Sequence, residues 1–295
     1  MNRSEVLEQI RKNVERLSLA DVPEYQYIPL HQKPSPSVPM IRRFMQLLKM
    51  VVFPGFFGTE QEAHPDSIQY YTGVYLEQIY DLLQGQVYNG LCFESESCCD
   101  TQDKSSDIAV AFINEIPQLK HLLSTDVKAI LDGDPAANSV SEVIFCYPAV
   151  QAILCQRTAH ILFKLGVPVL PRIITEMAHS ETGIDIHPGA QIGEYFSIDH
   201  GTGVVIGQTA IIGNHVRLYQ GVTLGAKSFT YDDEGLPIDV PRHPIIEDYV
   251  TIYSNTSVLG RITIGQGSVI GGNIWLTHDV PPNSKILQTR AIEEK

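Results

Sequence analysis

The chain is poor in cysteine, and its cysteines show no metal-binding spacing. Its five cysteines include no Cys-x-x-Cys pair, which is the spacing typical of structural zinc sites. Their odd number also argues against a disulfide framework. We therefore expect buried or incidental thiols in a reducing cytoplasm, and no metal ion.

Positive charge and long apolar runs are also scarce. The formal net charge of −13 over 295 residues argues against a general binder of nucleic acids or anionic membranes. No apolar run approaches the ~18 residues that a membrane span needs. The first residues, MNRSEVLEQI, do not resemble a signal peptide. These absences predict a cytoplasmic protein without nucleic-acid or membrane partners, and the length is sufficient for a sizeable core.

An aliphatic residue returns every six positions between Gly183 and Pro282. A period of six fits neither the 3.6 of a helix nor the 2 of a strand, but it is typical of a parallel β-helix built from hexapeptides. Each hexad would form a short strand and a turn, and three hexads would form one coil. The longest unbroken series is Ile246, Ile252, Val258, Ile264, Ile270 and Leu276.

The first 180 residues have the patterns of an α-helical region. A bend or a break at Pro117 is expected, since proline removes a backbone donor and clashes with the preceding turn. Proline-rich residues 23–40 predict a linker, and residues 89–103 and 131–140 predict loops. The expected helices are residues 1–22, 40–53, 65–84, 104–123, 148–165 and 169–178.

Residues capable of chemistry gather where the six-residue pattern breaks. Asp185 begins the first coil, and Asp199 and His200 lie where the pattern slips by two residues. The longest break, residues 227–244, ends in Arg242 and His243. Taken singly, each is typical of a solvated turn residue. Their combination in one β-helix indicates a functional site.

These residues belong to segments that resemble one enzyme family. The segments DIHPGAQIG, DHGTGVVIGQTAIIGNHV, VTLGA and RHP, with LDGDPAA before them, are similar to those of serine acetyltransferase, a hexapeptide-repeat acyltransferase. The resemblance covers about residues 126–283. It implies an α+β fold, an N-terminal α-helical domain followed by a left-handed parallel β-helix. We expect an N-terminal extension (1–60), a helical domain (61–182), a catalytic β-helix (183–283) with a long loop (227–244), and a tail (284–295).

The resemblance implies transfer of an acetyl group from acetyl-CoA to the hydroxyl of L-serine, the first step of cysteine biosynthesis. His200 matches the family's catalytic base, which takes the proton of the serine hydroxyl. Asp185 matches the carboxylate that orients this imidazole. The two residues lie fifteen positions apart, close to the roughly 18 residues of one coil. We therefore expect them on adjacent rungs.

The remaining site residues follow from the same resemblance. Asp134 and Asp199 match carboxylates that hold the ammonium group of the amino acid. Arg242 faces its carboxylate in the family, where a bidentate contact is expected, and His243 is a second substrate contact. Acetyl-CoA is a co-substrate and no metal is implied. The acetyl-CoA groove is matched by Gly225, Ala226, Ser254 and Gly272.

The resemblance also implies an assembly. Family members have active sites between protomers, so we expect a homotrimer, and pairing of two trimers stays open. Common members present a C-terminal isoleucine to the sulfhydrylase that uses O-acetylserine. Here Ile292 is followed by Glu293, Glu294 and Lys295. Burying unpaired charge costs several kcal/mol, so we expect no tight cysteine synthase complex through this tail.

Three alternatives use the same architecture. A related acyltransferase could acetylate another small hydroxyl acceptor, but it would not need both Asp134 and the RHP segment. A γ-type carbonic anhydrase needs three histidines around one metal, and His200, His215 and His243 lack its short spacing. A scaffold without catalysis would not need aspartate and histidine at the breaks.

Overall fold

The computed structural model describes residues 2–18, 34–94 and 101–288. The chain divides into two compact units, residues 1–34 and 35–295. The first unit contains α1 (Arg3–Ser18), which buries none of its residues. Its apolar stripe is the one that predicted a helix over residues 1–22. Residues 19–22 and most of the predicted linker lie outside the described residues.

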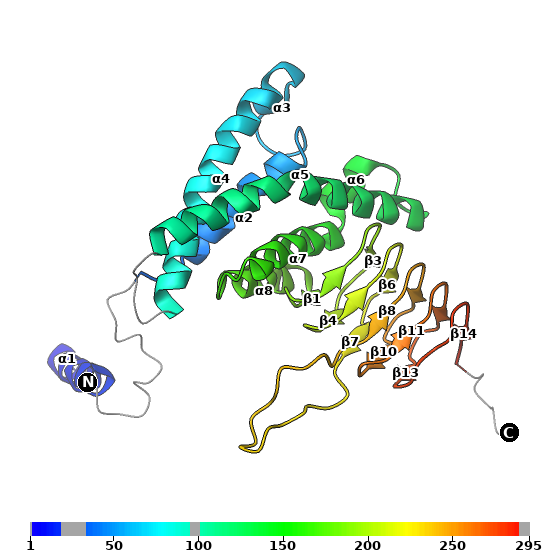
Figure 1. Cartoon of the computed structure of the whole chain (residues 1–295). Helices are drawn as coiled ribbons and strands as arrows, with labels where there is room; N and C mark the ends of the chain where they lie inside the picture. The colour runs from blue at the N-terminus through cyan, green and yellow to red at the C-terminus, as the bar shows by residue number, and fades with distance from the viewer. Residues whose placement is uncertain (1, 19–33, 95–100, 289–295) are drawn as a thin grey trace. The chain divides into compact units, whose positions relative to one another are not determined.

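The second unit begins with packed helices that lead into the β-helix (Figure 1). Prolines occupy the first turns of α2, α7 and α8, where a missing N–H costs nothing. Gly183 ends the last helix in the left-handed conformation with φ 71°, which glycine adopts without strain. The helices are α2 (Val38–Val52), α3 (Glu60–Ala63), α4 (Pro65–Glu94), α5 (Thr101–Gly133), α6 (Val140–Cys146), α7 (Pro148–Lys164) and α8 (Leu170–Thr182).

Two helices are longer than the sequence predicted. The expected loop at residues 89–103 is wrong over 89–94 and 101–103, which belong to α4 and α5. The helix is not broken at Pro117, because α5 continues through this residue. Ile116 and Leu119, on either side of this proline, are 4% and 1% exposed. Tertiary packing of this face offsets the hydrogen bond that the proline removes.

The second half of the unit is a parallel β-helix, which confirms the predicted fold class. Its short strands form three parallel sheets around one core (Figure 1). Sheet 1 contains β1 (Asp185–Ile186), β4 (Val205–Ile206), β7 (Thr223–Gly225), β10 (Ser257–Leu259) and β13 (Trp275–Leu276). Sheet 2 contains β2 (Gln191–Ile192), β5 (Ile211–Ile212), β8 (Ile245–Ile246) and β11 (Thr263–Ile264). Sheet 3 contains β3 (Ser197–Asp199), β6 (Arg217–Tyr219), β9 (Thr251–Ile252), β12 (Val269–Ile270) and β14 (Lys285–Ile286).

The six-residue pattern forms the core of the β-helix as predicted. In sheet 1, Ile186 lies beside Ile206, and Ile206 beside Leu224. All three are at most 2% exposed. At the break in the pattern, Thr202 is exposed and Val204 is fully buried. Because the turn after Asp199 has two extra residues, the residue that points into the core comes later in the sequence than in a regular hexad.

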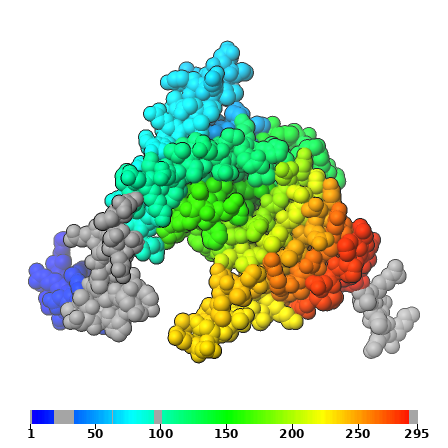
Figure 2. Space-filling view, in the orientation of Figure 1, coloured from blue at the N-terminus to red at the C-terminus, as the bar shows by residue number. Residues whose placement is uncertain are grey.

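The predicted division of the chain stays a proposal, and one boundary needs a shift. Strand β14 lies beyond residue 283 and pairs with β12, so the β-helix reaches Ile286. The loop of residues 227–244 carries an isolated bridge between Tyr231 and Pro237. Figure 2 shows it as a lobe that stands out from the β-helix. Within the described residues, no helix has the length and apolar character needed to cross a bilayer.

The helical layer rests on the first coil of the β-helix. Helix α5 contacts β3, α7 contacts β1 and β3, and α8 contacts β1. A buried ion pair secures this junction: Arg157 on α7 donates to both carboxylate oxygens of Asp126 on α5, at 2.7 and 2.8 Å. Arg157 also donates to the carbonyls of Ile192 and Gly193. This part of α5 is thereby held against the turn between β2 and β3.

Candidate functional site

The first part of the site is the turn from sheet 3 to sheet 1, which we call the His200 corner (residues 199–204). Two extra residues lengthen this turn relative to a regular hexad. His200 adopts φ 56°, and its side chain is 73% exposed. Its Nδ1 lies 3.9 Å from Oδ1 of Asp199. The lengthened turn therefore places the imidazole of His200 in solvent, beside the carboxylate of Asp199.

Asp134, just after α5, joins this corner from the helical layer. Its carboxylate accepts hydrogen bonds from the Tyr147 hydroxyl at 2.6 Å and the Ala136 N–H at 2.8 Å. These two bonds, as the largest causes, lower the pKa of Asp134. A small cavity has both Asp134 and Asp199 in its lining. The corner thus gathers two carboxylates and an imidazole from segments far apart in the sequence.

Two residues that hold this arrangement were missed by the sequence analysis. Tyr147 precedes Pro148 at the start of α7, and its bond to Asp134 raises the pKa of the phenol to about 12. Arg217 on β6 donates to the carbonyl of Gly133 at 3.0 Å. A Cβ on Gly133 would lie 2.3 Å from Arg217 Nη2, so a larger residue here would displace the guanidinium from this position. The sequence feature that could have indicated the Arg217 contact is the glycine at position 133, directly before Asp134.

Asp185 lies on the neighbouring rung but is not in contact with His200. The segments around the two residues stack, since Gly203 N–H donates to the carbonyl of Gly183 at 2.8 Å. Within the described residues, however, no hydrogen bond or ion pair joins Asp185 to His200. A carboxylate oxygen of Asp185 instead clusters with Glu176 and His179, with ligand atoms within 4.8 Å of one another. This cluster could hold a divalent cation, although Glu176 already pairs with Arg172.

The second part of the site is the turn from sheet 1 to sheet 2, which we call the His243 corner (residues 207–209 and 242–244). The ring of His243 is packed against Gly207, where a Cβ would lie 2.0 Å from Cδ2. Its Nδ1 accepts from the Thr209 N–H at 3.1 Å and lies 2.8 Å from the Thr209 hydroxyl. The ring proton is therefore assigned to Nε2. Burial, followed by the charges of Arg242 and Arg261, lowers the pKa of His243 to about 4.

Arg242 is held at the same corner by the long loop. Its guanidinium donates to Asp239 Oδ1 at 3.0 Å, to the carbonyl of Val240 at 3.3 Å and to Gln208 Oε1 at 3.1 Å. The side chain is 22% exposed. The loop therefore fixes the direction of the guanidinium while leaving part of it open to a ligand.

The four residues matched to acetyl-CoA divide between the two corners. Gly225 ends β7 and Ala226 follows it, on the same side of sheet 1 as the His243 corner. Ser254 and Gly272 belong to the column of turns below His200, where Asn273 N–H donates to the carbonyl of Ser254 at 2.8 Å. A Cβ on Gly272 would lie 3.0 Å from that carbonyl. Each corner thus carries half of the predicted substrate residues and half of the predicted acetyl-CoA residues.

The two corners flank sheet 1 on opposite sides. Every strand of this sheet runs from the His200 corner toward the His243 corner. One chain therefore brings Asp134, Asp199 and His200 together, and it places Arg242 and His243 elsewhere. The three histidines considered for a metal site also separate, since His215 lies at the third corner, between β5 and β6.

Comparisons with known proteins agree with this architecture. No protein-family model matches the chain. A serine acetyltransferase of Synechococcus elongatus is 47% identical over 265 residues, covering 87% of this chain and 83% of that protein. The Bacillus subtilis serine acetyltransferase is 46% identical over 166 residues, covering 56% of this chain and 73% of that protein.

Solved structures extend the comparison to the fold. Serine acetyltransferase 1 of Entamoeba histolytica, in complex with L-cysteine, superimposes with a TM-score of 0.74 at 36% identity, covering 87% of this chain and 89% of that one. A soybean serine acetyltransferase, complexed with serine, gives a TM-score of 0.55 at 28% identity, covering 85% and 97%. With its helical layer, its hexapeptide β-helix and its resemblance in sequence along most of its length, the chain belongs to the serine acetyltransferase family.

Proposed function

We propose that the chain transfers the acetyl group of acetyl-CoA to the hydroxyl of L-serine, giving O-acetylserine and CoA. The reaction is that of its family and opens cysteine biosynthesis. The observation that carries the proposal is the convergence of Asp134, Asp199 and His200 at one turn of the β-helix. Two carboxylates suit an ammonium group, and the imidazole beside them suits a hydroxyl that must lose its proton.

His200 acts as the general base. Its imidazole takes the proton of the serine hydroxyl while the oxygen forms a bond to the thioester carbonyl carbon. The carbon–sulfur bond then breaks, and the imidazolium returns the proton to the sulfur of CoA. Asp185 orients the imidazole in this proposal, which requires its carboxylate to turn from Glu176 and His179 toward His200.

Serine is held at both ends of its backbone. Asp134 and Asp199 bind the ammonium group, and the Tyr147 hydroxyl keeps Asp134 ionised and in place. Arg242 binds the carboxylate, and His243 donates to it from Nε2 as a neutral ring. Acetyl-CoA lies along Gly225, Ala226, Ser254 and Gly272. These assignments follow the family resemblance residue by residue.

The separation of the two corners supports a site shared between protomers. The His200 corner of one protomer meets the His243 corner of its neighbour, and a threefold axis closes the ring of contacts. A homotrimer then contains three complete sites, with sheet 1 turned toward the axis. Pairing of trimers into a hexamer through the helical layer, and a cytoplasmic location, also stay predictions.

The alternative is another small hydroxyl acceptor. It is less favoured because the site offers opposite charges for both ends of an amino acid, which a sugar or xenobiotic alcohol lacks. A γ-type metal site is not supported, because His200, His215 and His243 lie at three different corners.

The proposal is tested by following acetyl-CoA consumption with serine and with other acceptors. The other acceptors are ethanolamine and 3-hydroxypropionate, which each lack one charged group of serine, homoserine, whose hydroxyl is one carbon further away, and threonine, which adds a methyl group beside the hydroxyl. We expect serine to give a kcat/KM at least about tenfold above every other acceptor, since losing one charged hydrogen bond costs about 1.5–3 kcal/mol. Equal rates with ethanolamine, which lacks the carboxylate, would contradict the roles of Arg242 and His243.

A further inference from the structure

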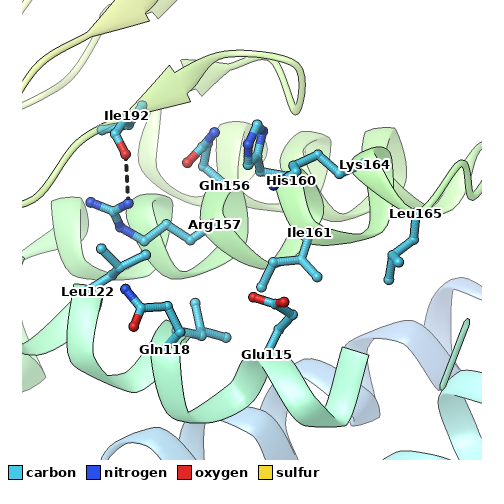
Figure 3. Close-up of a pocket in the computed structure, with 11 residues that line it drawn as sticks. Glu115, Gln118, Leu122, Gln156, Arg157, His160, Ile161, Lys164, Leu165 and Ile192 are labelled. Carbon is cyan, nitrogen blue, oxygen red and sulfur yellow. Dashed lines mark hydrogen bonds between the residues drawn. The ribbon is translucent and has the colours of Figure 1, made fainter. Parts of the chain in front are cut away.

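A second cavity lies between α5 and α7, away from both corners of the site. Its volume is about 300 Å³, at the lower end of the range for ligand pockets. On α5 the lining recurs at helical spacing as Glu115, Gln118 and Leu122. On α7 it recurs as Gln156, His160 and Lys164. Figure 3 shows Glu115 and Gln118 rising from α5 toward α7, whereas Gln156 and His160 lie on the side of α7 that faces the β-helix.

Part of the cavity wall is apolar. Leu122, Ile161, Leu165 and Ile192 are only half-buried, and each contributes to the lining. Ile192 is the exception in the first coil, because other inward aliphatic residues of the hexads are almost fully buried. A ligand with an aliphatic portion would remove this surface from water, which is favourable in proportion to the area covered.

The polar part of the wall contains unused charges of both signs. Among the described residues, the side chains of Glu115 and Lys164 make no hydrogen bond or ion pair, either with each other or elsewhere. Gln156 is 2% exposed, and its Nε2 donates to the carbonyl of Ala190 at 2.9 Å. Its Oε1 accepts no bond within the described residues. This oxygen is accessible to solvent, since the buried side-chain atoms without a partner among the described residues are the Tyr75 hydroxyl and Gln220 Oε1. A ligand donor in the cavity would replace water at this acceptor.

His160 adds a second acceptor. Its Nδ1 lies 2.8 Å from the carbonyl of Pro188, so Nδ1 carries a proton. Burial, followed by the charges of Lys164 and Arg157, lowers the pKa of His160. The ring is therefore neutral at pH 7, and Nε2 is left as an acceptor.

We propose that this cavity binds a free amino acid with an aliphatic side chain, distinct from the serine of the active site. The ligand's ammonium group pairs with Glu115 and donates to Gln156, its carboxylate pairs with Lys164, and its side chain covers the apolar wall. A compact zwitterion matches the volume, the two opposite charges and the apolar surface together. A simple amine or a simple fatty acid would satisfy only one of the two charges.

The cavity is connected to the active site through one of its own lining residues. Arg157 lies in the cavity wall and holds Asp126, whose Oδ1 accepts from the Phe196 N–H at 3.1 Å. Phe196 directly precedes β3, which ends at Asp199. A ligand that moves α5 relative to α7 would therefore shift Asp134 and Asp199 together. This consequence for serine binding rests on the proposed function, whereas binding in the cavity does not.

Isothermal titration calorimetry of the full chain, without acetyl-CoA, tests the binding. The probes are L-leucine and L-methionine, with isopentylamine and 4-methylpentanoate as leucine analogues that lack one charged group. We expect leucine or methionine to bind at least about tenfold more tightly than either analogue. Glu115→Gln and Lys164→Met should each weaken binding about tenfold or more, and Leu122→Trp, which fills the cavity, should abolish it. Circular dichroism checks that each variant is folded.

Matched controls separate this cavity from other sites. Asp107→Asn and Lys120→Met remove exposed charges of the same kinds from α5 outside the lining, and they should leave binding unchanged. Arg242→Gln should weaken serine binding and leave leucine binding intact. Leucine binding lost in Arg242→Gln but kept in Leu122→Trp would overturn the proposal. The absence of binding heat from either amino acid at about 10 mM, a concentration that would reveal even weak binding, would also overturn it. Acetyl transfer without leucine tests the proposed function separately.

Discussion

His200 occupies a backbone conformation that few residues adopt. Its φ of 56° lies in the left-handed region, where asparagine, aspartate and histidine are the non-glycine residues found most often. The side chain is largely exposed and contributes little to packing. A residue at this position is therefore free to serve catalysis, and its replacement should affect activity far more than stability.

We expect His200→Asn to lower kcat by about 10²–10⁴-fold, the usual contribution of a general base. Asparagine tolerates the left-handed conformation and cannot take the proton at pH 7. Steady-state acetyl transfer measures the effect, and the thermal unfolding midpoint should stay near that of the unmodified chain. A variant that keeps more than about a tenth of the turnover would contradict the assignment, because a lost base costs more.

Two histidines near the His243 corner make stability depend on pH. Burial, as the largest cause, lowers the pKa of both His187 and His243 to about 4, from an ordinary value of 6.5. Between pH 6.5 and 4 the unfolded chain binds protons at these rings and the folded chain does not. The free energy of unfolding should therefore fall as the pH decreases through this window.

Urea unfolding at several pH values measures this dependence. His243→Gln should reduce its slope between pH 6.5 and 4, since one of the two rings no longer takes up a proton on unfolding. His278→Gln is the control, because His278 is exposed on the last coil. A slope that is the same in His243→Gln and in the unmodified chain would show that His243 is not held neutral.

At the scale of elements, the β-helix was predictable and the helix boundaries were not. A six-residue period places an aliphatic residue inward at each strand, so the sequence alone indicates the coils, the core and the breaks that carry the site. Helix ends depend on tertiary packing instead. Cys92 is fully buried and Thr101 is 7% exposed, and this burial extends α4 and α5 into a segment whose polar residues indicated a loop.

The contacts between elements were also beyond the sequence. Asp126 and Arg157 are 31 residues apart, and neither belongs to a motif that predicts their pairing. The same holds for Tyr147 with Asp134, and for Arg217 with Gly133. By contrast, residues that interrupt the regular six-residue pattern could be proposed as site residues from the sequence. These residues are Asp199, His200, Arg242 and His243. What no pattern showed is that these two pairs occupy opposite sides of one sheet.

The Asp126–Arg157 pair should be the main tie between the helical layer and the β-helix. Both side chains are at most 5% exposed, so removing one partner leaves a buried charge. We expect Asp126→Asn and Arg157→Met each to lower the free energy of unfolding by about 3–5 kcal/mol. The double variant should cost less than the sum of the two.

Chemical denaturation measures these free energies. The exposed pair Lys128 and Asp132 on the same helix is the control, and Lys128→Ala should cost less than about 1 kcal/mol. Strict additivity of the two buried substitutions would mean that the pair does not act as a unit.

At the scale of the whole molecule, one chain places the residues of the proposed site at two separate corners. In the proposed reaction, the His200 corner provides the base and the carboxylates for the ammonium group, and the His243 corner provides the cation for the carboxylate. Sheet 1 separates the two corners. One complete site therefore requires at least two copies of the chain. In a closed trimer, every copy contributes its His200 corner to one site and its His243 corner to another.

Mixing two inactive variants within one assembly tests this claim most directly. His200→Asn and Arg242→Gln each damage one corner, so a site between protomers can combine the intact corner of each. After unfolding and refolding an equal mixture, up to about a quarter of the sites should be intact, as random assembly of a cyclic trimer gives. His200→Asn mixed with Asp134→Asn is the matched control, because both changes lie at the same corner and no site can be complete. The account predicts restored acetyl transfer in the first mixture and none in the second. Failure of the first mixture to exceed its separate components, with mixed assemblies confirmed by native mass spectrometry, would contradict it.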